Sequence, residues 1–185
     1  MPLDPHLRAA SSADAQNLAS LATQVFLHTY ATEGISRVIS GHVMEMFTPE
    51  RFSALIADPM ATVWVVERHA HLIGFAVVML NTPCPDEPRS TAELATLYVQ
   101  EHFIGKGVGS ALLARATAFA AERTSAPLWL TVNAANAPAI AFYARRGLRK
   151  IGVAWFQLGD AKHENLVLIS ALASLPAAAQ VSSNS

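Results

Sequence analysis

The chain has 185 residues, of which 52% are apolar and 15% charged, and its formal charge at pH 7 is −1. This length suits one domain with a substantial core and is short for two. The near-zero charge excludes the bulk attraction to nucleic acid or anionic lipid that strongly basic chains show. We therefore expect one globular domain over residues 1–172 and a flexible tail at residues 173–185, which has no apolar period.

Nothing in the sequence predicts export or a membrane anchor. The longest apolar run, LIGFAVVML at residues 72–80, is under half of the roughly 20 residues that a membrane helix needs, so it predicts a buried strand. The first ten residues lack the basic start and apolar core of a signal peptide. The single cysteine, Cys84, cannot form an internal disulfide, which agrees with a reducing compartment. We expect a cytoplasmic protein without membrane or nucleic-acid partners.

The first third of the chain predicts helices. Residues 11–14, SSAD, have the spacing of a capping box, and the apolar residues behind them recur at helical period. We therefore expect a helix over about residues 12–28. Weaker periodicity predicts two short helices between residues 34 and 57, the second beginning after Thr48 and Pro49.

The remaining elements predict a sheet. Residues 62–68 and 71–80 are β-rich and form an expected hairpin, whose second strand is apolar on both faces and hence central. Three prolines predict a loop at residues 81–90. The other expected elements are a strand at 92–99, a helix from Val108, a strand at 128–132, a helix at 136–146 closed by Gly147, and strands at 148–158 and 165–172. This order predicts a mixed sheet with helices on both sides, in an α/β (α+β) domain.

A glycine-rich segment separates one strand from the helix that follows it. Residues 103–113, FIGKGVGSALL, place Gly105, Gly107 and Gly109 within five positions. Free N–H groups and the positive end of the helix dipole meet at such a junction, which favours an anion, most often a phosphate. Glycine lets a phosphate approach the N–H groups and also permits positive φ. A simple turn with a glycine helix entry is the less favoured alternative.

Two common phosphate loops do not match this segment. A Walker loop needs a Lys followed by Ser or Thr, whereas Lys106 lies inside the glycine run with no hydroxyl residue beside it. A dinucleotide loop needs a third glycine where Ser110 stands and an acidic residue where Asn133 ends the next strand. That loop also follows the first strand of its fold, whereas two strands precede this one. The dinucleotide interpretation therefore remains a distant alternative.

From about residue 61 to residue 171, the chain resembles the GCN5-related N-acetyltransferase (GNAT) superfamily. In that family a strand, a Gln/Arg-x-x-Gly-x-Gly/Ala loop and a helix hold the pyrophosphate of acetyl-CoA. Here IGKGVG, residues 104–109, takes that place, with Ile104 where the family has Arg or Gln. A second family signature, an asparagine before a helix that ends in Tyr-x-x-x-Gly, matches Asn136, Tyr143 and Gly147. The resemblance implies a mostly antiparallel sheet of about six to seven strands flanked by helices.

The resemblance also implies an activity: transfer of an acetyl group from acetyl-CoA, as co-substrate and without a metal, to a primary amine. Amine attack would be direct, in a ternary complex. The resemblance places the Tyr143 hydroxyl beside the CoA sulfur as proton donor. The spacing of Asn136 and Tyr143 puts both on one helix face. The implied cofactor contacts are Leu97, Tyr98, Val99, Ile104, Gly105, Lys106, Gly107, Val108, Gly109, Ser110, Asn136 and Tyr143. Without the family motif, a core aromatic would be the commoner role for such a tyrosine.

A protonated amine needs a base, because it has no lone pair with which to attack a thioester. The resemblance makes Glu93, at the start of the strand before the glycine loop, the candidate. A solvent-exposed edge carboxylate has equal weight. Strand alternation predicts that Glu93 shares a face with Ala95, Leu97 and Val99. By the same resemblance, the Val99 N–H donates to the thioester oxygen as that atom gains charge.

Other chemistries lack the residues that they need. His69 and His71 flank a predicted turn, where a solvated pair is commoner than a metal site. Cys84, between two prolines, has no evident base, and Ser110 lacks a nucleophile elbow. Metal-dependent and triad hydrolysis are therefore disfavoured.

The acceptor is expected between the N-terminal helices and the last strands, where the family admits it. Candidate residues there are His28, Tyr30, Glu33, His42 and Glu45 on one side and residues 155–164 on the other. A small amine, a polyamine or a peptide would fit, and a homodimer stays open. A non-catalytic CoA-binding sensor or interaction module of the same fold is the alternative function, and the presence of both Tyr143 and Glu93 favours the enzyme.

Overall fold

The computed structural model describes residues 5–159 and 161–171, so the tail expected at residues 173–185 lies outside the described residues. The elements, in sequence order, are β1 (His6–Ala9), η1 (Ser12–Asp14), α1 (Ala15–Tyr30), α2 (Arg37–Met46), α3 (Pro49–Ala57), β2 (Ala61–Arg68), β3 (His71–Leu80), β4 (Ala92–Val99), η2 (Glu101–Phe103), α4 (Val108–Thr124), β5 (Leu128–Asn133), α5 (Ala137–Ala144), β6 (Arg149–Leu158) and β7 (Ala161–Ile169). None of the helices in these described ranges is long and apolar enough to cross a membrane.

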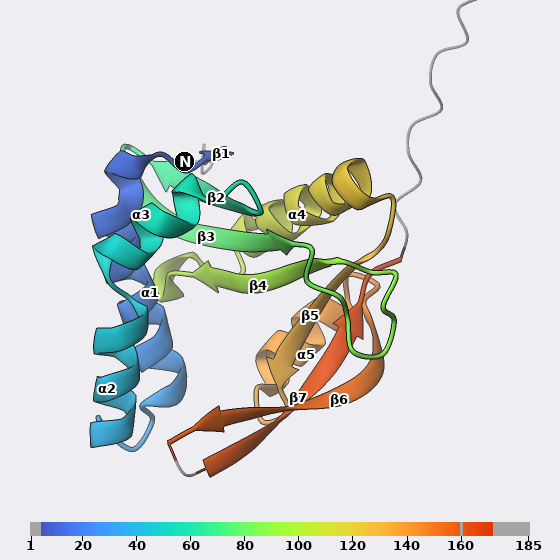
Figure 1. The fold of residues 1–185 in the computed structure, drawn as a ribbon. Helices are drawn as coiled ribbons and strands as arrows, with labels where there is room; N and C mark the ends of the chain where they lie inside the picture. Colours follow the sequence, from blue (N-terminus) through green and yellow to red (C-terminus); the bar gives the residue numbers. More distant parts are fainter. Residues whose placement is uncertain (1–4, 160, 172–185) are drawn as a thin grey trace, which may run out of the picture.

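The strands form one seven-stranded sheet in the order β1-β2-β3-β4-β5-β7-β6 (Figure 1). Only the β4–β5 pair is parallel, because α4 carries the chain back across the sheet between these two strands. All other neighbours are antiparallel. The mixed, mostly antiparallel sheet predicted from the sequence is therefore confirmed.

Apart from the short turn η2, which was not predicted, three elements differ from the sequence-based expectation. The strand β1 was not predicted; it pairs with β2 from His6 opposite Glu67 to Ala9 opposite Trp64. The helix α1 begins at Ala15 because residues 12–14 form a 3-10 turn. The strand β7 begins at Ala161, four residues earlier than expected, because its polar start pairs with the end of β6 in a long hairpin.

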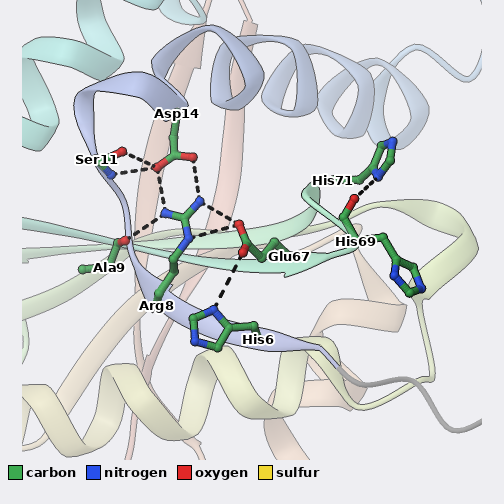
Figure 2. Close-up of polar contacts among 8 residues, drawn as sticks. All are labelled: His6, Arg8, Ala9, Ser11, Asp14, Glu67, His69 and His71. Atoms are coloured by element: carbon green, nitrogen blue, oxygen red, sulfur yellow. Dashed lines mark hydrogen bonds and ion pairs between the residues drawn. The ribbon is translucent and has the colours of Figure 1, made fainter.

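An ion-pair network explains why β1 joins the sheet (Figure 2). Arg8 in β1 donates from both terminal nitrogens to the Asp14 carboxylate, at 2.8 and 2.9 Å. It also donates to Glu67 Oε2 in β2, from Nε at 3.1 Å and from Nη2 at 2.8 Å. The same Asp14 carboxylate accepts from the Ser11 N–H at 2.7 Å. The network ties β1, η1 and β2 together, and it confirms the Ser11–Asp14 cap.

Helices cover both faces of the sheet. On one face, α1 and α3 pack on β2 and β3 around Leu18, Phe52 and Phe75. On the other face, α4 packs on β3, β4 and β5 through the stripe predicted from its period, including Val108, Leu112 and Phe119. Figure 1 shows α1, α2 and α3 together, well separated from α4.

The sheet opens between β4 and β5. β4 pairs with β3 along its whole length, from Ala92 to Val99. It pairs with β5 only through Ala92 with Leu128 and Glu93 with Trp129. Beyond Glu93, one side of β4 therefore has no strand beside it, and the glycine loop follows at the end of this free edge.

Candidate active site

The glycine loop ends in a helix N-terminus with free N–H groups. Gly105 (φ 78°) and Gly107 (φ 88°) are in the left-handed region, which explains glycine at both positions. Gly107 is the N-cap of α4, and the first intrahelical bond runs from Ala111 N–H to Gly107 O. The N–H groups of Val108, Gly109 and Ser110 precede that bond and have no intrahelical acceptor. A Cβ added to Gly105 or Gly107 would meet no atom within 4 Å, so the loop borders open space.

The packing of α4 on the sheet fixes where these donors lie. The Val108 side chain is buried, so this predicted cofactor contact can offer only backbone atoms. Gly74 in β3 lies directly beneath it: a Cβ there would come within 2.9 Å of Val108 Cγ1 and 3.0 Å of Tyr98 O. The sequence did not single out Gly74, because its role depends on a helix more than thirty residues away.

Backbone groups of β4 face the opening. The Gln100 N–H donates to Ile73 O at 3.0 Å. In an antiparallel ladder, every second residue bonds to the neighbouring strand, so this bond identifies which residues of β4 face β3. The peptide groups of Leu97 and Val99 therefore point away from β3, toward the free edge. Tyr98 differs from these two: its peptide group faces β3, and its ring packs on the α1 side of the sheet.

A β-bulge corrects the expected orientation of Glu93. Val77 pairs with Thr96 and Val78 with Leu94, so Ala95 is an extra residue in β4. Strict alternation placed Glu93 on the face of Leu97 and Val99, and that expectation is wrong. Leu94, Leu97 and Val99 pack in the α4 core, whereas Glu93 lies opposite Met79, which packs with α1. Partial burial raises the pKa of the Glu93 carboxyl.

Tyr143 lies deep between α5 and the sheet. Its side chain is buried, with the Phe142 ring edge-on at 5.2 Å between centroids. Burial raises the pKa of Tyr143, and the nearby Tyr30 hydroxyl raises it further. The phenol therefore stays protonated throughout the neutral range. Burial, with smaller effects of Tyr30 and Tyr143, likewise raises the pKa of Tyr98. Three phenols from α1, β4 and α5 therefore lie near one another.

Asn136 links two of these elements. It is the N-cap of α5 rather than its first helical residue, and its Oδ1 accepts from the Ala139 N–H at 3.1 Å. Burial raises the pKa of Tyr30, and a hydrogen bond from the Asn136 side chain partly opposes that rise. Sequence reasoning gave Tyr30 only a place among the acceptor-side residues.

A cavity of about 170 Å³ lies between α1 and the end of β4. Ile104 lines it and is 63% exposed. The His28 Nδ1 lies 3.4 Å from Glu101 Oε2 at its rim. The other lining residues are Gln24, Val25, Thr29 and Val99. The cavity thus joins the first position of the loop motif to the helix on the expected acceptor side.

The acceptor-side residues predicted from the sequence are only partly brought together. His42 stacks on Phe26 at 4.7 Å and meets the Phe156 ring edge-on at 6.4 Å, so α2 contacts β6. Burial lowers the pKa of His42, and the negative charge of Glu45 partly opposes this shift. Glu33 and Glu45 are exposed, and Trp155 is 66% exposed. The contacts of His42 therefore link α1, α2 and β6 through aromatic rings on the expected acceptor side.

Arg146 joins the site although no motif marked it. It follows α5, and its Nε donates to Ser110 Oγ at 3.1 Å. Lys106, also in the loop, lies with its Nζ 5.4 Å from the centre of the Phe103 ring. Two cations therefore accompany the free N–H groups of α4.

Comparison with known proteins agrees with this geometry. An uncharacterized N-acetyltransferase of Mycobacterium tuberculosis (strain ATCC 25618 / H37Rv) is 28% identical over 152 residues, covering 82% of this chain and 93% of that protein. Streptothricin acetyltransferase of Streptomyces lavendulae is 47% identical over 49 residues, 26% of each protein.

Solved structures show the same fold. The PaiA N-acetyltransferase of Thermoplasma acidophilum, in complex with coenzyme A, superposes with a TM-score of 0.73 at 19% identity, over 90% of this chain and 98% of that one. The ribosomal-protein-S18-alanine N-acetyltransferase of Escherichia coli gives 0.63 at 18% identity, over 94% and 97%. The model of the acetyltransferase (GNAT) family matches residues 25–148, well over half of the chain. The chain therefore belongs to the acetyltransferase (GNAT) family.

Proposed function

We propose that this protein transfers the acetyl group of acetyl-CoA to a primary amine by direct attack, with a small amine, a polyamine or a peptide as acceptor. The observation that carries the proposal is the free edge of β4, which ends in the N–H groups of α4. An extended ligand with a thioester at one end and a pyrophosphate in its middle has hydrogen-bond acceptors for both sets of donors. The thioester end matches the free edge of β4, and the pyrophosphate matches the N–H groups of α4. The neighbour solved with coenzyme A has the same fold.

The residues divide the reaction between them. The N–H groups of Val108, Gly109 and Ser110 bind pyrophosphate oxygens, and the Val99 N–H donates to the thioester oxygen as it gains charge. Glu93, directly or through water, takes a proton from the acceptor ammonium. The amine nitrogen then forms its bond to the acetyl carbon as the carbon–sulfur bond breaks. Tyr143 donates to the departing sulfur, and the second proton lost by the nitrogen restores the tyrosine. The products are therefore an amide, a CoA thiol and the one proton taken up by Glu93.

The glycines exclude side chains from the phosphate path. Any residue other than glycine is strained at Gly107, whose φ is 88°. Cofactor contacts through Gly105, Lys106 and Ile104 remain part of this proposal, although Ile104 can offer no charged group. Asn136 and Tyr98 would contact the thioester end, where their side chains approach Tyr30 and Tyr143.

A panel of amines, assayed for CoA release with a thiol reagent, tests the proposal. Titration calorimetry with acetyl-CoA runs beside it on the same preparation. We expect acetyl-CoA to bind and at least one amine to release CoA above the rate without amine. Binding without release on any amine would support a non-catalytic module instead. Absence of binding would contradict the proposed site itself.

A further inference from the structure

The Arg146 guanidinium lies at the N-terminus of α4, although Arg146 belongs to the turn after α5. Its Nε donates to Ser110 Oγ at 3.1 Å, and its Nη2 contacts the same oxygen. Its central carbon lies 4.4 Å from the centre of the Phe142 ring. That ring also approaches Gly109, where a Cβ would come within 3.4 Å of Phe142 Cζ. Stacking on Phe142 and the Ser110 hydroxyl together hold the guanidinium beside the first turn of α4.

This position is electrostatically unfavourable for a cation. The N-terminus of a helix carries a positive partial charge, and cations are favoured at the opposite end. Lys106 adds a second positive charge in the same loop. Within residues 5–159 and 161–171, no ion pair joins Arg146 to a carboxylate. An anion bound at the N-terminus of α4 would offset these positive charges.

Ile104 leaves the glycine loop without a polar side chain at the first position of its motif. The resemblance noted above puts Arg or Gln at this point of the loop, whereas the Ile104 side chain is exposed and has no polar group. The loop itself therefore lacks the planar donor that its motif leads one to expect. Arg146 brings a planar donor, from another element, to the first turn of the helix that follows this loop.

We propose that Arg146 binds the pyrophosphate of acetyl-CoA and takes the place of the side chain that Ile104 cannot supply. The proposal rests on the proposed function, because it concerns the same cofactor. An arginine can donate two parallel hydrogen bonds to a phosphate, which a single N–H cannot do. Ser110 connects the two donors: its N–H is one of the free amides of α4, and its hydroxyl holds the guanidinium.

Calorimetry of acetyl-CoA binding to Arg146→Gln tests the assignment. Loss of a charge-assisted hydrogen bond to phosphate should weaken binding about tenfold. The melting temperature should not fall, because an exposed contact contributes little to folding. Arg145→Gln is the matched control: it removes the same charge from the neighbouring exposed residue, and its affinity should equal that of the wild type. Equal affinities for wild type and Arg146→Gln would overturn the proposal.

A second variant tests the replacement of Ile104. Ile104→Arg, added to Arg146→Gln, should restore most of the lost affinity, because the exposed position has room for a longer side chain. Failure to restore any affinity would overturn the idea that Arg146 substitutes for this position. The same titrations with 3′-dephospho-CoA identify the phosphate. The tenfold loss should persist, and its disappearance would assign Arg146 to the 3′-phosphate instead.

The wild-type titration separates this proposal from the proposed function. A wild-type protein that does not bind acetyl-CoA would contradict the cofactor site as a whole. A wild type that binds tightly, beside an Arg146→Gln variant that binds equally, would contradict the role of Arg146 alone.

Discussion

Tyr143 combines a buried ring with a hydroxyl near two other phenols. An ordinary thiol has a pKa near 8.5, well below that of this phenol. Complete proton transfer from Tyr143 to a thiolate is therefore uphill. The tyrosine is better suited to a hydrogen bond that strengthens as charge develops on sulfur, and the proton released from the amine can replace any that it gives up.

Tyr143→Phe keeps the ring and its packing and removes only the hydroxyl. If the hydroxyl acts in the transition state, kcat and kcat/KM should both fall about a hundredfold. The affinity for acetyl-CoA and the melting temperature should change little. A lower melting temperature with turnover nearly intact would instead identify Tyr143 as a structural residue.

Glu93 should control the acidic side of the pH profile. As burial raises its pKa, the base becomes protonated at a higher pH than an exposed glutamate would. Glu93→Gln should lower kcat/KM most in the neutral and mildly acidic range. The difference from wild type should shrink as the pH approaches the pKa of the amine, where the acceptor needs no base. A variant profile that is uniformly lower at every pH would contradict this role.

The same substitution has a separate effect on folding. A carboxyl whose folded pKa is raised binds its proton more tightly in the native state, so stability is lost as the pH rises through that pKa. At pH 7 the charged Glu93 therefore opposes folding, and Glu93→Gln should not lower the midpoint of urea unfolding. A large fall in that midpoint would indicate that Glu93 supports the fold.

Helix α4 carries the N–H groups that we propose bind phosphate, and one glycine of β3 sets how closely this helix approaches the sheet. Gly74 has Val108 Cγ1, Tyr98 O and Leu112 Cδ1 within 3.3 Å of the place where a Cβ would lie. Tyr98 O is a backbone atom and cannot move aside without displacing β4. The packing of α4 and the direction of the β4 free edge are therefore linked.

Gly74→Ala should destabilise the protein by about 1–3 kcal/mol, the usual cost of overpacking a core. It should also weaken acetyl-CoA binding, because α4 must shift away from β4. Gly41→Ala is the control: Gly41 lies inside α2, and a Cβ there meets no atom within 4 Å. That change should stabilise the protein by about 0.5–1 kcal/mol. Urea unfolding measures both, and a Gly74→Ala variant as stable as wild type would contradict the packing argument.

The elements that the sequence predicts well are those with a strong local signal. The stripe of α4, the apolar β3 and the glycine loop each carry their period or composition within the segment itself. By contrast, β1 has only four residues, and its place in the sheet depends on Arg8 reaching Asp14 and Glu67. The bulge at Ala95 depends on pairing with β3, so alternation placed Glu93 on the wrong face. The contact of Arg146 with Ser110 likewise joins residues 36 positions apart.

On the far side of the opening between β4 and β5, the last two strands contact one of the N-terminal helices. The hairpin of β6 and β7 reaches α2, where a Cβ on Gly159 would lie 3.1 Å from Val38 Cγ1. Phe156 and His42 make a second contact between the same elements. Figure 1 shows this hairpin extending from the sheet toward α2. The expected acceptor entrance is therefore bounded by elements from both ends of the chain.

Phe156→Ala should loosen this boundary. We expect KM for the amine found in the panel to rise about two- to tenfold, the value of one aromatic pair, with the acetyl-CoA Kd unchanged. Trp155→Ala is the matched control, because Trp155 is the neighbouring exposed aromatic and points to the opposite face of β6. An equal rise in KM for both variants would show that the Phe156–His42 contact is not responsible.

The short parallel junction between β4 and β5 has a consequence for amide hydrogen exchange. Along the end of β4, alternate amides differ in protection: those of Tyr98 and Gln100 face β3, whereas those of Leu97 and Val99 face the free edge. Exposed amides exchange with solvent even when their neighbours are held in a ladder. In the free protein, Leu97 and Val99 should lose deuterium label quickly, and Tyr98 and Gln100 slowly. A ligand seated along the edge would slow every second amide, so the bound protein would show nearly uniform protection along this strand.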